Sequence, residues 1–357
     1  MKVLGISLYP KQMEYLEMVD YIKKASNYGF KKVFSSLHIP EYRLEEQIDF
    51  VSRLAEITYA QGMELVTDVR GSVLREIYSN EAKREAMEKI HIDAYRIDFE
   101  LEEDILAIAK KMGAKQIYIN TSTIDKDKLA KYSKLAKKYE LVLKSCHNFY
   151  PRPETALGED FFHKQNSIFA EKNVTVAAFL PSKYKTRGPI NEGLPTVESH
   201  RNMPFEKAAF QMFSWNDIDE ILIGDMMASP DELSLLSTLN SETLTLRIDL
   251  YEECYRERLT GESHGIRYDS GAFQIRLEGF RGMASYAEAI IEEKNATFRK
   301  AGSITIDNQL YGRYQGEVQI VTRDLCDDPR VNVIGRVILE DLWKLKYKDD
   351  YKQIVFI

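Results

Sequence analysis

The chain of 357 residues carries a net charge of −7, with 44% hydrophobic and 29% charged residues. This length exceeds what one ordinary core supports and predicts two domains. The acidic balance disfavours a nucleic-acid partner, because binding to a phosphate backbone needs a concentrated basic face. No apolar run approaches the ~18 residues of a membrane span, and the charged N-terminal segment is typical of a first strand rather than of a signal peptide.

Cysteine usage indicates the compartment. Cys146, Cys254 and Cys326 are widely spaced, form no CxxC pair and leave one cysteine unpaired in any disulfide scheme. This pattern is typical of a reducing environment. We therefore expect a cytoplasmic protein that has no membrane partner.

Residues 2–239 alternate short apolar runs with longer helical patterns, which is typical of repeated βα units around a parallel sheet. The eight expected strands are 3–8, 32–36, 64–67, 94–97, 116–119, 141–144, 174–179 and 220–223. Helical periodicity is clearest in 12–27, 44–61, 103–112 and 126–139, with Gly29, Gly62 and Gly113 as stops. The pattern favours a (β/α)8, TIM-like barrel over 1–239. The competing doubly wound sheet usually carries a glycine-rich phosphate loop after its first strand, and this chain has none there.

The pattern changes after residue 239. Seven short alternating or apolar runs separated by turn residues make 240–357 β-rich, and its one clear helical candidate is 286–294. The second domain should therefore be a small all-β barrel. The predicted fold class is α/β, with the barrel in 1–239 and the β domain in 240–357.

Polar residues follow the expected strands at the end where a βα barrel carries its active site. They are Asp68 and Arg70 after the third strand, Arg96 and Asp98 in and after the fourth, Asn120 and Ser122 after the fifth, and Asp225 after the eighth. The loop after the sixth strand, 147–158, reads HNFYPRPETALG and combines imidazole, amide, guanidinium and carboxylate groups beyond what turns require. The loop 185–201 after the seventh strand is long enough for a lid or a binding loop.

A structural reading stays open for both loops. His147 and Asn148 could cap a helix or tie down a turn, while Arg152 and Glu154 pair in solvent. The 185–201 loop could be a solvated insertion whose charges have no function.

Several sequence segments resemble one family across nearly the whole chain. They are YRIDFEL around Asp98, IYINTST around Asn120, HNFYPRPET from His147, TRGPINEGLPTVESHR at 186–201, ILIGDMMAS around Asp225, HGIRYDSGAFQIR from His264, and GSITIDNQLYGRYQGEVQI from Gly302. The family is that of the bacterial proteins long called outer surface proteins or grouped by a domain of unknown function, since linked to 6-phospho-N-acetylmuramidase, a glycoside hydrolase. The resemblance implies a TIM barrel followed by a cyclophilin-like β barrel. It also implies cleavage of N-acetylmuramic acid 6-phosphate linked to N-acetylglucosamine in cell-wall sugar recycling.

Glycoside hydrolysis needs a carboxylic acid that protonates the leaving oxygen and a second group that supports the oxocarbenium-like centre. We predict Asp98, Glu154 and Asp225 as the catalytic carboxylates. Their division into acid, base and nucleophile stays open, as does the stereochemical course. The N-acetyl group of the sugar is an alternative nucleophile, and one carboxylate would then only orient it.

The predicted substrate-binding residues are Asp68, Arg96, Asn120, His147, Asn148, Arg152, Arg187, Glu192, Glu198, Arg201 and Arg313. Arg152, Arg187 and Arg201 are the candidates for the 6-phosphate, because a guanidinium forks onto phosphate oxygens. Arg313 from the β domain is a candidate for the lactyl carboxylate, although local pairing on the domain surface is an equal alternative.

The six histidines are scattered without an HxxxH or HxE pair, so we predict no metal and no organic cofactor. Two other functions stay open. One is a non-catalytic phosphosugar sensor, and the other is a barrel isomerase or lyase whose only candidate base is Lys144. Two roles also stay open for the β domain, capping the barrel mouth and forming a homodimer.

Overall fold

The computed structural model describes residues 1–11, 13–98, 101–269, 271–280 and 290–357. They form two compact units, 1–240 and 241–357, and each is described by itself.

The first unit is a closed barrel of parallel strands in the order β1 to β8, with β1 paired to both β2 and β8. The strands are β1 (Val3–Ser7), β2 (Lys32–Ser36), β3 (Glu64–Val69), β4 (Ala94–Ile97), β5 (Gln116–Asn120), β6 (Val142–Cys146), β7 (Val176–Leu180) and β8 (Glu220–Ile223). All eight lie where the apolar runs predicted them, so the predicted TIM-like barrel is confirmed.

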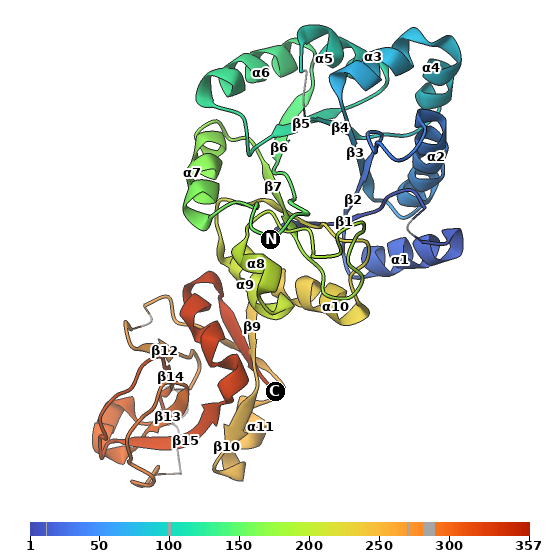
Figure 1. The fold of residues 1–357 in the computed structure, drawn as a ribbon. Helices are drawn as coiled ribbons and strands as arrows, with labels where there is room; N and C mark the ends of the chain where they lie inside the picture. Colours follow the sequence, from blue (N-terminus) through green and yellow to red (C-terminus); the bar gives the residue numbers. More distant parts are fainter. Residues whose placement is uncertain (12, 99–100, 270, 281–289) are drawn as a thin grey trace. The chain divides into compact units, whose positions relative to one another are not determined.

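Helices surround this ring of strands (Figure 1). They are α1 (Tyr15–Asn27), α2 (Leu44–Ala60), α3 (Gly71–Ser79), α4 (Glu81–Glu88), α5 (Glu103–Lys111), α6 (Lys126–Lys138), α7 (Glu159–Ala170), α8 (Ser199–Asn202), α9 (Phe205–Ser214) and α10 (Pro230–Leu239). The predicted stops Gly29, Gly62 and Gly113 all have positive φ, the conformation that glycine adopts without strain at a helix end. The pair α3 and α4 was not predicted. Asn80 separates them, because its extended backbone ends α3 and its side chain accepts from Lys83 N at 3.0 Å to cap α4.

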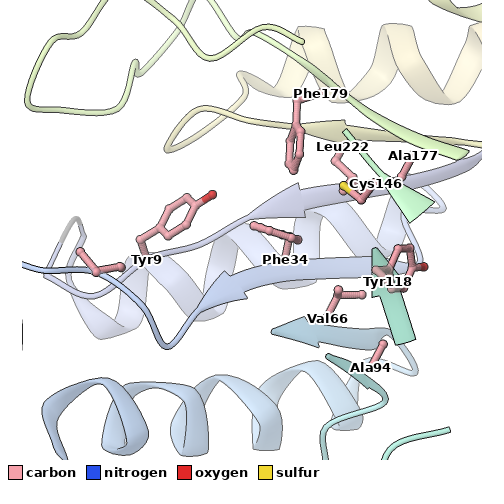
Figure 2. Close-up of a cluster of buried hydrophobic side chains, with 10 residues drawn as sticks. Tyr9, Phe34, Val66, Ala94, Tyr118, Cys146, Ala177, Phe179 and Leu222 are labelled. Atoms are coloured by element: carbon pink, nitrogen blue, oxygen red, sulfur yellow. The ribbon is translucent and has the colours of Figure 1, made fainter. Parts of the chain in front are cut away.

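The interior of the barrel contains an apolar cluster that runs along its strands. The cluster drawn in Figure 2 comprises Tyr9, Phe34, Ile39, Val66, Ala94, Tyr118, Cys146, Ala177, Phe179 and Leu222. Phe34 and Phe179 meet edge to face with ring centroids 5.2 Å apart. This cluster fills the barrel beneath the polar residues of its mouth.

A charged network fills the opposite, amino-terminal end of the barrel. Lys32 at the start of β2 contacts Glu220 at the start of β8 over 2.9 Å, and Lys144 contacts the same Glu220 oxygen over 3.0 Å. The Tyr118 hydroxyl also donates to Glu220 at 2.9 Å. Lys144 was the candidate base for an isomerase. Its ion pair with Glu220 holds it away from the carboxyl ends of the strands, where the active site of a βα barrel lies.

The second unit contains a five-stranded sheet in the order β10-β15-β13-β14-β12 and a three-stranded sheet in the order β11-β16-β9. The strands are β9 (Thr243–Leu246), β10 (Ile248–Leu250), β11 (Ser263–Gly265), β12 (Gln274–Arg276), β13 (Ser303–Asp307), β14 (Val318–Val321), β15 (Val331–Val337) and β16 (Gln353–Phe356). Short helical segments join them: η1 (Glu253–Tyr255), α11 (Arg256–Leu259), η2 (Gln309–Tyr314) and η3 (Leu339–Asp350). The predicted β-rich character is thus confirmed.

The predicted helix 286–294 falls partly outside the described residues, which omit 286–289. The remaining residues, 290–294, are not helical. Their backbone is held by long-range contacts instead, since Lys294 N donates to Asn332 Oδ1 at 3.0 Å. Among the described helices of the whole chain, none is long and apolar enough to cross a membrane.

Candidate functional site

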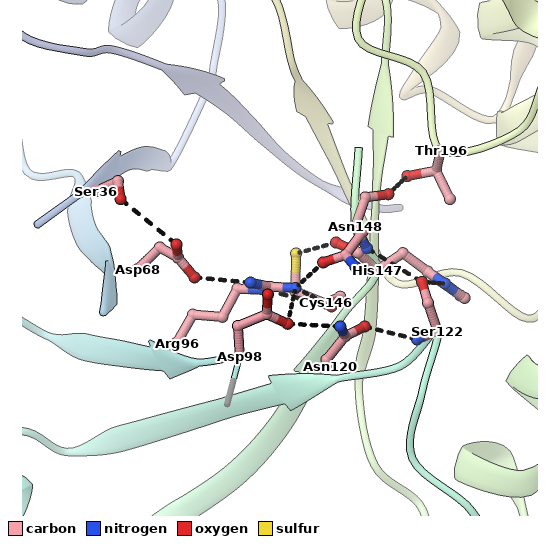
Figure 3. A network of polar contacts seen from close by, with 10 residues as sticks. All are labelled: Ser36, Asp68, Arg96, Asp98, Asn120, Ser122, Cys146, His147, Asn148 and Thr196. Carbon is pink, nitrogen blue, oxygen red and sulfur yellow. Dashed lines mark hydrogen bonds and ion pairs between the residues drawn. The ribbon is translucent and has the colours of Figure 1, made fainter. Parts of the chain in front are cut away.

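The carboxyl ends of β3 to β6 bring the predicted polar residues together at the barrel mouth (Figure 3). Asp68, Arg96 and Asn120 lie on β3, β4 and β5, and Asp98 follows β4. His147 and Asn148 follow β6. The convergence of these six residues was predicted from strand order, because parallel strands end on one face of a barrel.

Arg96 is the centre of this network. Its side chain is 5% exposed, and it donates to Asp68 Oδ1 over 2.7 Å and to Asn148 Oδ1 over 2.6 Å. A weaker contact of 3.4 Å joins it to Asp98 Oδ1. Burial disfavours the guanidinium charge, but Asp68 and Asp98 outweigh burial and keep the pKa of Arg96 above its ordinary value. A fixed positive charge therefore holds two carboxylates at the mouth.

Asp68 belongs both to this network and to a cavity. Burial raises the pKa of Asp68 above its ordinary value, although Arg96 acts in the opposite direction. Its second oxygen lies 3.5 Å from Ser36 Oγ on β2. A carboxyl group whose pKa is raised keeps its proton to a higher pH than an exposed one does.

Asp98 has different partners. Asn120 Nδ2 donates to Asp98 Oδ1 over 2.5 Å, and the amide of Asn120 is itself held because Ser122 N donates to its Oδ1 over 2.8 Å. Every contact made to the Asp98 carboxylate in the described part of the chain thus comes from a donor. These donors fix the orientation of the Asp98 carboxylate at the mouth.

A cavity of about 250 Å³ opens beside Asp68. Its lining residues are Tyr9, Phe34, Ser36, His38, Ile39, Pro40, Glu41, Asp68, Phe149, Pro151, Arg187, Gly188, Pro189 and Leu194. Tyr9, Ser36, His38 and Glu41 were not predicted. Tyr9 follows β1, Ser36 is the last residue of β2, and His38 and Glu41 follow it, so the strand-end rule used for the later strands would have found them.

Arg187 is the predicted phosphate ligand that reaches this cavity. Its guanidinium carbon lies 3.4 Å from the centroid of the Tyr9 ring and 5.5 Å from that of Phe149. Burial raises the pKa of Tyr9 to about 12, so the ring below Arg187 stays neutral. No ion pair of Arg187 occurs among the residues that the structure describes, and stacking leaves the N–H groups at its edge available to a ligand.

His147 lies behind the mouth. It is fully buried, its Nδ1 lies 2.9 Å from Ser122 Oγ, and its Nε2 lies 2.7 Å from Asn166 Oδ1. Burial lowers the pKa of His147 to about 4, so the ring is neutral at physiological pH. Ser122 Oγ in turn accepts from Asn148 N at 3.2 Å, which connects His147 to the position of Asn148.

Arg201 and Glu198 connect the loop 147–158 after β6 to the loop 185–201 after β7. Arg201 is 3% exposed and donates to Glu198 and to four backbone carbonyls, those of Tyr150, Arg152, Glu192 and Gly193. Glu198 also accepts from the backbone N–H groups of Glu154 and Ala156 at 3.0 and 2.9 Å. The hydrogen bond from Arg201 lowers the pKa of Glu198 to about 2. The donors of Arg201 are therefore occupied by protein atoms.

Asp225 is placed differently from Asp98. It is fully buried at the end of β8 and accepts three backbone N–H groups, those of Ser182, Arg187 and Leu194, over 2.9 to 3.1 Å. Burial raises the pKa of Asp225, against the effect of these N–H groups. It is not among the residues that line the cavity.

Three further predicted residues are exposed and do not line the cavity: Arg152, Glu154 and Glu192. Arg313 belongs to the second unit, where it donates to the Tyr314 hydroxyl over 2.9 Å. Its predicted contact with the substrate stays a prediction. No group of three or more His, Cys, Asp or Glu side chains suited to a metal ion occurs within the described ranges.

Two family models together match almost the whole chain. A family model described as 6-phospho-N-acetylmuramidase, N-terminal, matches residues 4–238, and the corresponding C-terminal model matches 244–357. A conserved protein of unknown function from Enterococcus faecalis is 30% identical with a TM-score of 0.74, over 99% of this chain and 96% of that one. An uncharacterised B. cereus protein is 27% identical with a TM-score of 0.75, over 100% and 99% of the two chains. No curated protein matches the chain.

Proposed function

Because the chain belongs to the 6-phospho-N-acetylmuramidase family, glycosidases that hydrolyse phosphorylated N-acetylmuramic acid linked to N-acetylglucosamine in cell-wall recycling, we propose how its barrel mouth performs this cleavage. The observation that carries the proposal is the pair of carboxylates, Asp68 and Asp98, held by one buried guanidinium. A protein that only senses a phosphosugar has no use for such a pair, which favours the hydrolase.

Asp68 is the general acid of the proposed reaction. It lines the cavity, and burial raises its pKa, which favours the protonated form that a general acid needs. This proton passes to the glycosidic oxygen as the bond to the anomeric carbon breaks, and N-acetylglucosamine leaves as an alcohol. Water then adds to the anomeric carbon and gives a proton to the Asp68 carboxylate, which restores the acid for the next cycle.

Asp98 supports the positive charge that develops at the anomeric carbon. Asn120 and Arg96 hold its carboxylate in place before the substrate arrives, so little reorganisation is needed during the reaction. Asp98 can provide this charge either directly or through the N-acetyl group of the sugar, and both courses need an ionised, oriented carboxylate.

Arg187 binds the 6-phosphate. Tyr9 and Phe149 orient its guanidinium from below, and the cavity of about 250 Å³ is smaller than the roughly 300 Å³ at which drug-sized sites begin. It therefore fits one saccharide unit with its phosphate rather than both rings.

Glu154 and Asp225, the other carboxylates predicted to be catalytic, are assigned no chemical step in this scheme.

The test compares the phosphorylated disaccharide with its unphosphorylated counterpart, measuring release of N-acetylglucosamine by wild type, Arg187→Gln and Arg152→Gln. Arg152 is the matched control, because it is an exposed arginine of the neighbouring loop that does not line the cavity. We expect wild type and Arg152→Gln to prefer the phosphorylated sugar, and Arg187→Gln to lose about tenfold or more in kcat/KM for it. Equal cleavage of both sugars by wild type would contradict the proposal.

The compartment and oligomeric state belong to the same proposal. All three cysteines are free, which supports a cytoplasmic enzyme acting on sugars after their uptake. A homodimer stays a prediction, which sedimentation equilibrium of the full chain would test.

A further inference from the structure

We propose that Asp225 is a positioning residue, which fixes Arg187 in the cavity by holding the backbone of the loop 181–198, the whole connection between β7 and α8. This inference rests on the proposed function, since Arg187 matters only if it binds the phosphate. It gives the predicted catalytic aspartate a role that requires no contact with the reacting atoms.

One carboxylate organises three distant points of the loop. Asp225 Oδ1 accepts from Arg187 N at 3.0 Å, and Oδ2 accepts from Ser182 N at 2.9 Å and from Leu194 N at 3.1 Å. Ser182 lies just after β7, and Leu194 is twelve residues further along the chain. The carboxylate therefore joins the start, the middle and the far side of the loop to the end of β8.

The loop backbone packs directly on the end of β8. A Cβ at Gly224 would lie 2.5 Å from Leu194 O and 3.0 Å from Leu194 Cβ, so this position has no room for a side chain. Gly193 has a φ of +80°, and a Cβ there would lie 3.3 Å from Pro181 Cβ. These contacts keep Leu194 N within reach of the carboxylate.

The same hydrogen bonds set the position of the Arg187 side chain. Its backbone N–H is fixed by Asp225, and its guanidinium rests on Tyr9 at 3.4 Å without an ion pair in the described part of the chain. The backbone anchor and the aromatic surface together define where the phosphate-binding edge lies. A small displacement of such a group is enough to lower substrate affinity.

The experiment measures kcat and KM on the phosphorylated disaccharide, and the inhibition constant of N-acetylmuramic acid 6-phosphate. The proteins are wild type, Asp225→Asn, Arg187→Gln and the double variant, with Asp20→Asn as the control at an aspartate whose side chain is 61% exposed. In Asp225→Asn the amide group turns a donor toward at least one loop N–H, so the loop loses an anchor. We expect KM and the inhibition constant to rise about tenfold while kcat changes by less than about threefold. The double variant should have the KM of Arg187→Gln alone, because both changes remove the same interaction.

Amide hydrogen exchange of wild type and Asp225→Asn gives a readout that needs no substrate. Faster exchange at Ser182, Arg187 and Leu194 together with the KM increase would support the inference. A fall in kcat with unchanged KM would overturn it, because Asp225 would then act on the reacting atoms. Faster exchange with unchanged KM and kcat would overturn it as well.

A second variant covers the case in which Asp225→Asn does not fold. Gly193→Ala strains the loop beside Leu194 and leaves Asp225 in place, so it should also raise KM more than it lowers kcat. Unchanged KM in this folded variant would count against the inference. Failure of the proposed function has a separate signature, since wild type itself would then show no preference for the phosphorylated sugar.

Discussion

Arg96 donates to the Asp68 carboxylate over 2.7 Å from the neighbouring barrel strand, yet burial keeps the pKa of Asp68 raised. Two opposing effects thus act on one carboxyl group, and burial is the larger. The guanidinium holds Asp68 in place, while burial favours the protonated form of its carboxyl group.

The first prediction concerns the pH profile. The acid form of Asp68 is needed, so kcat/KM should fall as pH rises through its pKa. Arg96→Gln removes a charge that lowers this pKa, so the alkaline limb should move to higher pH while the rate at the optimum falls. The measurement is kcat/KM against pH for wild type, Arg96→Gln and the exposed control Arg53→Gln. Movement of the limb to lower pH in Arg96→Gln would count against Asp68 as the acid.

The second prediction concerns acid stability. Burial lowers the pKa of His147 and of His200 to about 4 in the folded protein, whereas an unfolded chain protonates histidine near 6.5. Each ring therefore contributes stability that is complete above about pH 6.5 and is lost as pH falls toward 4, up to about 3 kcal/mol.

His200→Phe isolates this effect, because phenylalanine keeps the stacking on Trp215, where the ring centroids are 5.2 Å apart. Urea unfolding between pH 7 and 4 should show a shallower pH dependence in the variant than in wild type. Parallel curves would show that His200 is not buried in its neutral form.

The third prediction concerns the contacts by which Arg201 connects the loops 147–158 and 185–201. Arg201→Met should lower the free energy of unfolding by about 3 kcal/mol, because Glu198 loses its cation and four carbonyls lose their donor. Arg152→Met, at an exposed arginine, should change it by less than about 0.5 kcal/mol. Urea titrations of both variants test this difference, and equal stability would refute the assigned role.

The fourth prediction concerns the charged end of the barrel. Glu220→Gln leaves Lys32 and Lys144 close together without their shared carboxylate, so the free energy of unfolding should fall by about 3 kcal/mol. The folded variant should keep the wild-type kcat, because Glu220 lies at the amino-terminal end of its strand. Loss of kcat in a variant that remains folded would contradict this separation of stability from chemistry.

Strand order made much of this site predictable. Asp68, Arg96, Asp98 and Asn120 could be placed together because parallel strands end on one face. The same rule was not applied to the first two strands, and Tyr9 and His38 were missed for that reason.

The contacts of Asp225 and Arg201 could not be inferred in this way. A buried carboxylate that binds loop N–H groups and one that faces a cavity have the same residue type and the same place after a strand. Only the path of the 181–198 loop, which returns to β8 through Leu194, distinguishes them. The contacts of Arg201 likewise depend on where the backbone carbonyls of two loops meet at its guanidinium, which the sequence pattern does not show.

The assignment of Asp68 as the general acid is the central claim, and leaving-group dependence tests it most directly. The measurement is kcat/KM of Asp68→Asn and Asp98→Asn on the phosphorylated disaccharide and on the 4-nitrophenyl glycoside of N-acetylmuramic acid 6-phosphate. Nitrophenol leaves without protonation, so Asp68→Asn should lose about a thousandfold on the disaccharide and less than about tenfold on the aryl glycoside. Asp98→Asn should lose activity on both substrates. Equal losses on the two substrates in Asp68→Asn would contradict the claim.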